Sequence, residues 1–161
     1  YQGPAAVRYP RGSGTGIDAQ PQMQLLPLGK AKVVRQGENI AILAFGPLLS
    51  ACQHAAEQLN ATLVDMRFVK PIDEELLHEV FQNYELVVTV EDATVVGGLG
   101  SAVLEFMNAH HYHSQVRILG IPDTIVEHGS VKELQQECHY DAMAIANAVK
   151  NLLGKSVLVE G

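Results

Sequence analysis

Four apolar runs recur along this chain, and each is followed by a segment with the periodicity of an amphipathic helix. The runs are "IAILAF" at 40–45, "TLVDM" at 62–66, "LVVTV" at 86–90 and "VRILGI" at 116–121. Near-continuous apolar strands are typical of parallel sheets, in which helices cover both faces. Because parallel neighbours need crossover connections, the alternation predicts an α/β fold, a three-layer α/β/α sandwich with a mostly parallel sheet.

The segments between the runs place their apolar residues on one helical face. The three stripes are Leu48, Cys52, Ala55, Ala56 and Leu59, then Leu76, Leu77, Val80 and Phe81, then Leu99, Ala102, Val103, Phe106 and Met107. After the last run, Ser130 and Glu133 have the spacing of a capping box, which predicts a helix start. A terminal helix is expected to turn five residues inward: Ala142, Ile145, Ala146, Val149 and Leu153.

The residues around these runs divide the chain into parts of different composition. Residues 1–11 include the short extended piece "AAVRYP", and residues 12–29 are rich in glycine, proline, glutamine and serine, which indicates a linker. The α/β domain is expected over 30–154, with 155–161 as a tail. Inside it, the turn "QGEN" predicts a hairpin that places a first short strand, as an antiparallel edge, beside 40–45.

Composition narrows the classes of partner. The 161-residue chain fits one domain, carries a formal net charge of −7 and has no apolar run near the roughly 20 residues of a membrane span. Nucleic acid is disfavoured because its phosphates would be repelled except near Arg8 and Arg11. With no signal peptide visible, Cys52 and Cys138 are expected to be reduced thiols on apolar helix faces of a cytoplasmic protein without a membrane partner.

Three polar segments follow the apolar runs, at the edge where ligands bind in open α/β sheets. They are residues 65–73, 90–101 and 120–130. In the second, Gly97, Gly98 and Gly100 lead into a helix and would offer backbone N–H groups to a phosphate. Val103 stands where a dinucleotide fingerprint needs its third glycine. Close packing of the helix on the sheet, or of a partner's backbone, is therefore favoured over a nucleotide site.

Two acidic residues, Glu91 and Asp92, follow the third run. Paired carboxylates at a strand end suit acid–base chemistry or a bound cation. Adjacent residues of an extended chain point in opposite directions, so a pair that shares one proton is disfavoured. We expect these residues to cap the following helix or to pair with Arg67 or Lys70.

The histidines offer further hypotheses. His110, His111 and His113 follow the third helix, where their density suits a metal. No cysteine or carboxylate accompanies them at ligand spacing, and a histidine at a helix C-terminus also complements the helix dipole. His128 precedes a helix start, where a proton carrier and an interface or capping role both stay open. With no nucleophile elbow and no P-loop, we expect neither a complete catalytic set nor a metal site in this chain.

Four stretches, taken in order, resemble one enzyme family. They are "VRYPRG", "LNATLVDMRFVKPID", "VEDATVVGGLGSAV" and "GIPDTIVEHGS". Together they are similar to the C-terminal portion of the 1-deoxy-D-xylulose-5-phosphate synthases, thiamine-diphosphate enzymes of the transketolase superfamily. The similarity runs from about Gly3 to Leu153, almost the whole chain. The resemblance implies the fold of the transketolase C-terminal domain.

The same resemblance implies a transferase that condenses pyruvate with glyceraldehyde 3-phosphate, releases CO2 and makes 1-deoxy-D-xylulose 5-phosphate for isoprenoid, thiamine and pyridoxal synthesis. Thiamine diphosphate and Mg2+ would be bound by domains that this chain lacks, so the chain alone is expected to be inactive. Residues 1–11 would end the pyrimidine-binding domain of a bacterial, cytoplasmic homodimer. Residues 30–154 would supply dimer and domain contacts.

One functional residue carries over from the family's motif. The arginine that follows "YP", Arg11, would contact the substrate phosphate, because a guanidinium grips phosphate oxygens with two parallel hydrogen bonds. Side chains alternate along an extended piece, so Arg8 is expected to face away and to form a structural ion pair. Asp92 departs from the family's commoner glutamate, which leaves its role open.

Two other classes of protein remain as alternatives. A stand-alone α/β interaction module would have a start codon directly before this segment, and the beginning at Tyr1, inside an extended piece, argues against it. The C-terminal domain of a related 2-oxoacid dehydrogenase beta chain would share the fold. The motifs "VRYPRG" and "EHG" disfavour that second alternative.

Overall fold

The computed structural model describes residues 2–7, 9, 22 and 24–159, with side chains described as far as Gly154. Within this range five strands form one sheet: β1 (Lys32–Arg35), β2 (Ile40–Phe45), β3 (Thr62–Asp65), β4 (Leu86–Thr94) and β5 (Gln115–Ile121). A 3-10 turn, Gly46–Leu48, leads into the first of five helices: α1 (Leu49–Leu59), α2 (Glu74–Asn83), α3 (Leu99–Ala109), α4 (Val131–Glu137) and α5 (Ala142–Val159). Each apolar run predicted as a strand is a strand.

The strand order in the sheet is β1-β3-β2-β4-β5. Strands β2 to β5 pair in parallel, and β1 pairs antiparallel with β3 at one edge. The predicted fold class, a mostly parallel sheet with one antiparallel edge strand, is therefore confirmed. Strands β2 to β5 all end at the same edge of the sheet, which we call the carboxyl edge, and β1 starts there.

The predicted hairpin between β1 and β2 is wrong, because β1 lies beside β3. The four-residue connection passes across the start of β3, where the Glu38 N–H donates to the Asn60 carbonyl at 2.7 Å and the Gly37 N–H donates to Thr62 Oγ1 at 2.8 Å. A Cβ at Gly37 would lie 2.3 Å from Ala61 backbone. Because Gly37 has no side chain, the connection runs close against the start of β3. The chain then continues into β2, which pairs with β3 on the side opposite β1.

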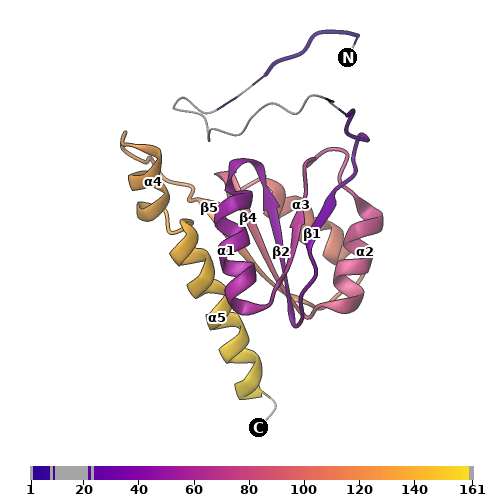
Figure 1. The fold of residues 1–161 in the computed structure, drawn as a ribbon, viewed down its shortest axis with the longest axis vertical. Coiled ribbons are helices and arrows are strands. Elements are labelled where there is room, and N and C mark those ends of the chain that lie inside the picture. The colour runs from indigo at the N-terminus through magenta and orange to yellow at the C-terminus, as the bar shows by residue number, and fades with distance from the viewer. Residues whose placement is uncertain (1, 8, 10–21, 23, 160–161) are drawn as a thin grey trace.

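Helices cover both faces of the sheet, which gives the predicted three layers (Figure 1). The alternation along β2 shows how the sequence produces them. Ile40, Ile42 and Ala44 pack in one core with α1 and α5, and Ala41 and Leu43 pack in a second core with α2 and α3. Both cores consist mainly of apolar side chains, with Thr89 of β4 as a fully buried polar exception, so burial on each side of one sheet stabilises the whole domain.

The helix ends largely follow the predicted signals. Ser130 and Glu133 form the predicted capping box at the start of α4. The Ser130 hydroxyl and backbone N–H both donate to the Glu133 carboxylate, and these hydrogen bonds hold the pKa of Glu133 below its ordinary value.

In α5, Ile145, Ala146 and Val149 are buried as predicted. Ala142 is exposed, contrary to the prediction, and it is the first residue of the helix.

Candidate functional site

The carboxyl edge brings together the three polar segments that follow the strands. Residues 66–73 follow β3, residues 95–98 connect β4 to α3, and residues 122–130 connect β5 to α4. Lys32 at the start of β1 pairs with Asp65 at the end of β3, so the residues that lead into β1 reach the same edge. Figure 1 shows this edge at the top of the domain, with α4 beside it. Most of the expected site residues of the described chain therefore lie along one edge of the sheet.

Glu91 fills the N-terminus of α3. Its Oε2 accepts from the Leu99 N–H at 2.7 Å, its Oε1 accepts from the Gly100 N–H at 2.9 Å, and the residue is 1% exposed. A negative group at this point is favoured by the helix dipole and by the unpaired N–H groups of the first turn. The protein's own carboxylate thus occupies the position that a phosphate would take, and the structure gives no nucleotide cradle at α3.

The glycines before α3 are explained by close packing. A Cβ at Gly98 would lie 2.1 Å from the Glu91 carboxylate, and a Cβ at Gly100 would lie 2.5 Å from the Ile118 side chain on β5. Gly97 has φ of +76°, a left-handed conformation that favours glycine. Helix-on-sheet packing, the interpretation favoured from the sequence, is therefore what Gly98 and Gly100 provide.

Asp92 points to the opposite face from Glu91, as alternation along a strand requires. It is half-buried, and its Oδ1 accepts from the Tyr140 hydroxyl at 3.0 Å. Tyr140 is buried just before α5, and burial together with this hydrogen bond raises the pKa of its hydroxyl. The contact ties the end of β4 to the connection between α4 and α5. The two acidic residues therefore hold different helices and do not act as a pair.

Of the two roles expected for Glu91 and Asp92, the described residues show helix capping by Glu91, and Arg67 forms its ion pair with Asp65. Arg67 adopts a left-handed backbone, with φ of +54°, and its Nε lies 3.5 Å from Asp65 Oδ2 in its own turn. The Arg67 N–H also donates to Asp65 Oδ1 at 3.3 Å. A turn that folds back on the end of β3 keeps the guanidinium beside Asp65, and Glu91 receives backbone donors in place of Arg67 or Lys70.

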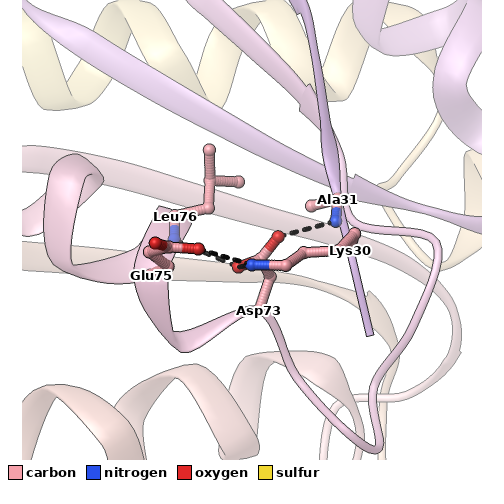
Figure 2. Close-up of polar contacts among 5 residues, drawn as sticks. All are labelled: Lys30, Ala31, Asp73, Glu75 and Leu76. Atoms are coloured by element: carbon pink, nitrogen blue, oxygen red, sulfur yellow. Dashed lines mark hydrogen bonds and ion pairs between the residues drawn. The ribbon is translucent and has the colours of Figure 1, made fainter. Parts of the chain in front are cut away.

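Asp73 is a site residue that sequence reasoning missed (Figure 2). It caps α2, where its Oδ1 accepts from the Leu76 N–H at 3.2 Å, and its Oδ2 accepts from the Ala31 N–H at 2.9 Å. Lys30 Nζ lies 3.5 Å from Asp73 and 2.5 Å from Glu75. The available signal was an aspartate before two glutamates and an apolar helical stripe, which marks a helix start.

Asp73, the second acidic helix cap after Glu91, also fixes the point where the chain enters the domain. Gly29 is buried, with φ of +69°, and a Cβ there would lie 2.8 Å from the Pro71 ring. The motif "FVKPID" thus holds Gly29 through Pro71 and Ala31 through Asp73. We call this arrangement the clasp: Gly29, Lys30 and Ala31 held by Pro71 and Asp73. The segment before β1 is anchored at one defined place.

His128 lies in an exposed connection. Residues 122–125 and 127–130 are exposed, and the Ile125 side chain is 96% exposed. The structure places His128 outside the contacts made by Glu91 and Asp92, so no proton-carrying partner for it is assembled within the described residues. Other large apolar side chains nearby in sequence or at the same edge are also exposed, namely Val96, Val131 and Met143. This part of the carboxyl edge therefore exposes large apolar side chains among polar ones.

The histidines after α3 have structural roles at the opposite edge of the sheet. The His110 ring lies 4.3 Å from the Phe106 ring and 4.6 Å from the His78 ring, between centroids. His78 Nδ1 lies 2.8 Å from the Tyr112 hydroxyl. His111 takes a left-handed conformation that ends α3. Within the part of the chain that the structure describes, no three metal-ligating side chains gather.

The cysteines are unpaired, as predicted. Cys52 is buried, and burial raises the pKa of its thiol to about 12. Cys138 is half-buried at the end of α4, where burial and Glu137 raise its pKa as well. Both thiols are therefore poor nucleophiles.

The two N-terminal arginines, Arg8 of the expected ion pair and Arg11 of the expected phosphate contact, lie outside the described residues. No helix among the described residues is long and apolar enough to cross a membrane.

The strand order, with helices packed on both faces of the sheet, defines an α/β sandwich domain with one antiparallel edge strand. The chain belongs to the transketolase C-terminal domain family, whose model matches residues 29–145. It is 50% identical over 147 residues to the 1-deoxy-D-xylulose-5-phosphate synthase of Nitrosospira multiformis, covering 91% of this chain and 24% of that protein.

Other relatives agree with this assignment. The 1-deoxy-D-xylulose-5-phosphate synthase of Nitrosococcus oceani is also 50% identical over 147 residues, which are 91% of this chain and 23% of that protein. The chain thus spans about a quarter of the length of these relatives. Among solved structures, the inactive beta4 tetramer of a split-gene transketolase is 33% identical with a TM-score of 0.74, covering 83% of this chain and 45% of that one.

A more distant structure shows the fold alone. The transketolase of Leishmania mexicana is 17% identical with a TM-score of 0.59, covering 79% of this chain and 18% of that one. The resemblance to the family, stated from the four sequence stretches, is confirmed by these comparisons.

Proposed function

We propose that this chain is the C-terminal part of a 1-deoxy-D-xylulose-5-phosphate synthase. The full enzyme condenses pyruvate with glyceraldehyde 3-phosphate, releases CO2 and forms 1-deoxy-D-xylulose 5-phosphate, a precursor for isoprenoid, thiamine and pyridoxal synthesis. The observation that carries the proposal is 50% identity over 91% of the chain to proteins of that name. Identity at this level favours the synthase over a 2-oxoacid dehydrogenase beta chain.

The cofactor fits no group of residues described in this chain. Thiamine diphosphate needs a cradle for its diphosphate, and the glycine-rich start of α3 is filled by Glu91. Mg2+ needs several oxygen ligands, and no three metal-ligating side chains gather within the described residues. Both thiamine diphosphate and Mg2+ are therefore assigned, in this proposal, to other domains of the enzyme. The chain alone would be inactive.

The chain's own contribution to substrate binding would be Arg11. Its guanidinium would bind the phosphate of glyceraldehyde 3-phosphate, because a planar fork of donors matches phosphate oxygens and stays charged. Arg11 belongs to residues 1–11, which would complete the pyrimidine-binding domain, and residues 12–29 would link that domain to this one. The clasp supports this arrangement because it fixes the domain's end of the linker.

The uncovered half of the carboxyl edge would contact the other domains or the second subunit of a homodimer in the bacterial cytoplasm. Ile125 is 96% exposed and Met143 is 73% exposed, so their burial against a partner would be favourable. The split-gene transketolase tetramer, described as inactive, supports the idea that a chain of this fold lacks activity without its other part.

A chimera tests the proposal. The matching C-terminal region of the Nitrosospira multiformis enzyme is replaced by this chain, and product formation from pyruvate and glyceraldehyde 3-phosphate is followed. We expect an active chimera, while the isolated chain and the truncated enzyme give no product. In the chimera, Arg11→Gln should raise the KM for glyceraldehyde 3-phosphate by about tenfold or more and leave the KM for pyruvate nearly unchanged.

The matched control is Arg8→Gln, which keeps the same charge change three residues away and should affect the glyceraldehyde 3-phosphate KM far less. A folded chimera that binds thiamine diphosphate and forms no product would contradict the proposed reaction. Equal effects of the two substitutions would contradict the role of Arg11.

A further inference from the structure

A groove of about 450 Å³ lies between β5 and α5, away from the carboxyl-edge contacts of Glu91 and Asp73. It exists because α5 packs against α1 and β4 (Figure 1), which leaves one face of the edge strand β5 partly uncovered. Val116 and Ile118 of β5 face the α3 side, and Arg117 and Leu119 face the α5 side. The groove is thus a consequence of where α5 sits.

The lining of the groove combines donors with an apolar floor. Arg117 of β5, Asn147 and Asn151 of α5, and His139 supply polar groups, while Leu119 and Leu152 supply apolar surface. Asn147 and Asn151 are four residues apart, so they lie on one helix face. Among the described residues that line the groove, none is acidic. A few converging polar groups over apolar side chains are typical of small-ligand sites.

Arg117 is the group that determines the class of ligand. In the described part of the chain, its guanidinium takes part in no ion pair and no hydrogen bond. The chain carries a formal net charge of −7, with acidic residues outnumbering basic ones by 18 to 11. Arg117 is exposed to solvent, and no carboxylate among the lining residues competes for its guanidinium. Its fork of donors suits carboxylate or phosphate oxygens.

His139 places an imidazole in the lining of the groove. It follows α4 in the left-handed conformation, with φ of +57°, and the Tyr140 N–H donates to the Gln135 carbonyl while the His139 N–H donates to the Gln136 carbonyl. This pair of bonds is a Schellman motif, whose left-handed position is usually glycine. The sequence uses histidine there and so places an imidazole beside the groove. His111 ends α3 in the same conformation, so the backbone alone assigns His139 no role, and its place in the groove lining is what counts here.

We propose that the β5–α5 groove is a binding site for a small anion, a carboxylate or a phosphate, held by Arg117 with help from His139, Asn147 and Asn151. The site is separate from the substrate phosphate contact proposed for Arg11, because it lies within the folded domain and uses none of the residues of 1–11. Its ligand would bind the C-terminal domain itself.

An NMR titration of the 161-residue chain tests the proposal. The probes are inorganic phosphate and, separately, malonate, with ionic strength held constant by chloride. We expect saturable shifts of the Arg117 guanidinium and of the Asn147 and Asn151 side-chain amides, with a dissociation constant on the order of 1 mM. The tighter probe identifies whether phosphate or carboxylate is the better fit. If neither probe gives saturable shifts at these groups, the proposal is overturned.

Variants separate binding in this groove from binding elsewhere on the chain. Arg117→Gln should weaken binding by about tenfold, since it removes a charged bidentate donor. His139→Gly should weaken binding by about threefold with an unchanged or higher melting temperature, because glycine suits the left-handed position. The matched control is His111→Gly, since His111 ends α3 in the same motif outside the groove. It should leave binding unchanged.

Two outcomes would overturn the assignment. One is an Arg117→Gln chain that binds as tightly as the original. The other is loss of the saturable shifts in an Arg11→Gln chain, which would show that the anion binds at the proposed substrate contact. Retention of the shifts in Arg11→Gln keeps the groove separate from the proposed function, whatever the chimera does.

Discussion

The carboxyl edge of this domain has two halves that are built differently. In the sealed half, α2 and α3 each begin on a buried carboxylate supplied by the chain, Asp73 at α2 and Glu91 at α3. In the open half, residues 122–131 carry large apolar side chains such as Ile125 and Val131 that are mostly exposed. Both halves follow parallel strands of the same sheet.

The difference shows that position at a carboxyl edge does not by itself make a ligand site. The sealed half has the helix N-termini that bind phosphates in many α/β proteins, and here they are closed by Glu91 and Asp73. The open half has one helix N-terminus, that of α4, which Ser130 and Glu133 close with a capping box, and its connection exposes large apolar side chains such as Ile125. One half stabilises the domain, and the other is suited to contact with the rest of the enzyme. Substitutions in each half test this division.

The largest effect is expected from opening the sealed half at α3. Glu91→Ala leaves the Leu99 and Gly100 N–H groups buried without an acceptor and removes a favourable charge from the helix N-terminus. We expect a loss of about 3 kcal/mol in the free energy of unfolding, measured with urea. The control Glu91→Gln keeps the shape and an acceptor oxygen and should lose less. A Glu91→Ala chain as stable as the original would contradict the capping role of Glu91.

The next largest effect is expected from crowding the close contact between Gly100 of α3 and Ile118 of β5. Gly100→Ala places a methyl group against Ile118, where a Cβ would lie 2.5 Å from the side chain. Overpacking of this kind should cost about 2 kcal/mol in the free energy of unfolding. The double substitution Gly100→Ala with Ile118→Val should recover part of that loss, since it shortens the side chain that the new methyl group meets. Additive losses in a double-mutant cycle would show that the contact does not exist.

A smaller effect is expected at the clasp. Asp73→Ala removes the cap of α2 and the acceptor for the Ala31 N–H, and should cost about 1 to 2 kcal/mol. Glu75→Ala removes only the exposed partner of Lys30 and should change stability by less than about 0.5 kcal/mol. Thermal unfolding of both variants measures the difference. Equal losses would mean that the ion pair, and not the cap, holds the clasp.

The smallest effect on the isolated chain is expected in the open half. Ile125→Ser changes a side chain that is 96% exposed, so the unfolding free energy should move by less than about 0.5 kcal/mol. In the synthase chimera the same change should lower the melting temperature, because a partner covers this residue there. Gln136→Ser, an exposed position on α4, is the control. An Ile125→Ser chimera as stable as its parent would place the contact elsewhere.

Much of the fold follows from local pattern. The apolar runs and the 3.6-residue stripes predict the strands, the helices and the three layers, because each is encoded within a short segment. The predicted hairpin between β1 and β2 is wrong because pairing is decided at long range. The choice of β3 as partner for β1 depends on contacts such as that of Glu38 with Asn60, which no turn pattern records.

The sequence likewise predicts some contacts of the candidate site and misses others. Capping by Glu91 could be expected because the residue follows a strand and precedes a glycine-rich helix start. The bond from Asp73 to the Ala31 N–H joins residues 42 positions apart and leaves no local signal. The sequence leaves pairing with Arg67 open beside capping because it does not show the left-handed backbone that directs Arg67 to Asp65.

Amide hydrogen exchange tests most directly whether the open half joins this domain to the rest of the enzyme. It is measured on the isolated chain and on the same chain within the synthase chimera. We predict that residues 122–131 exchange rapidly in the isolated chain and gain protection in the chimera, while residues 99–106 of α3 are protected in both. Unchanged rapid exchange of 122–131 in an active chimera would contradict the claim that the open half joins this domain to the rest of the enzyme.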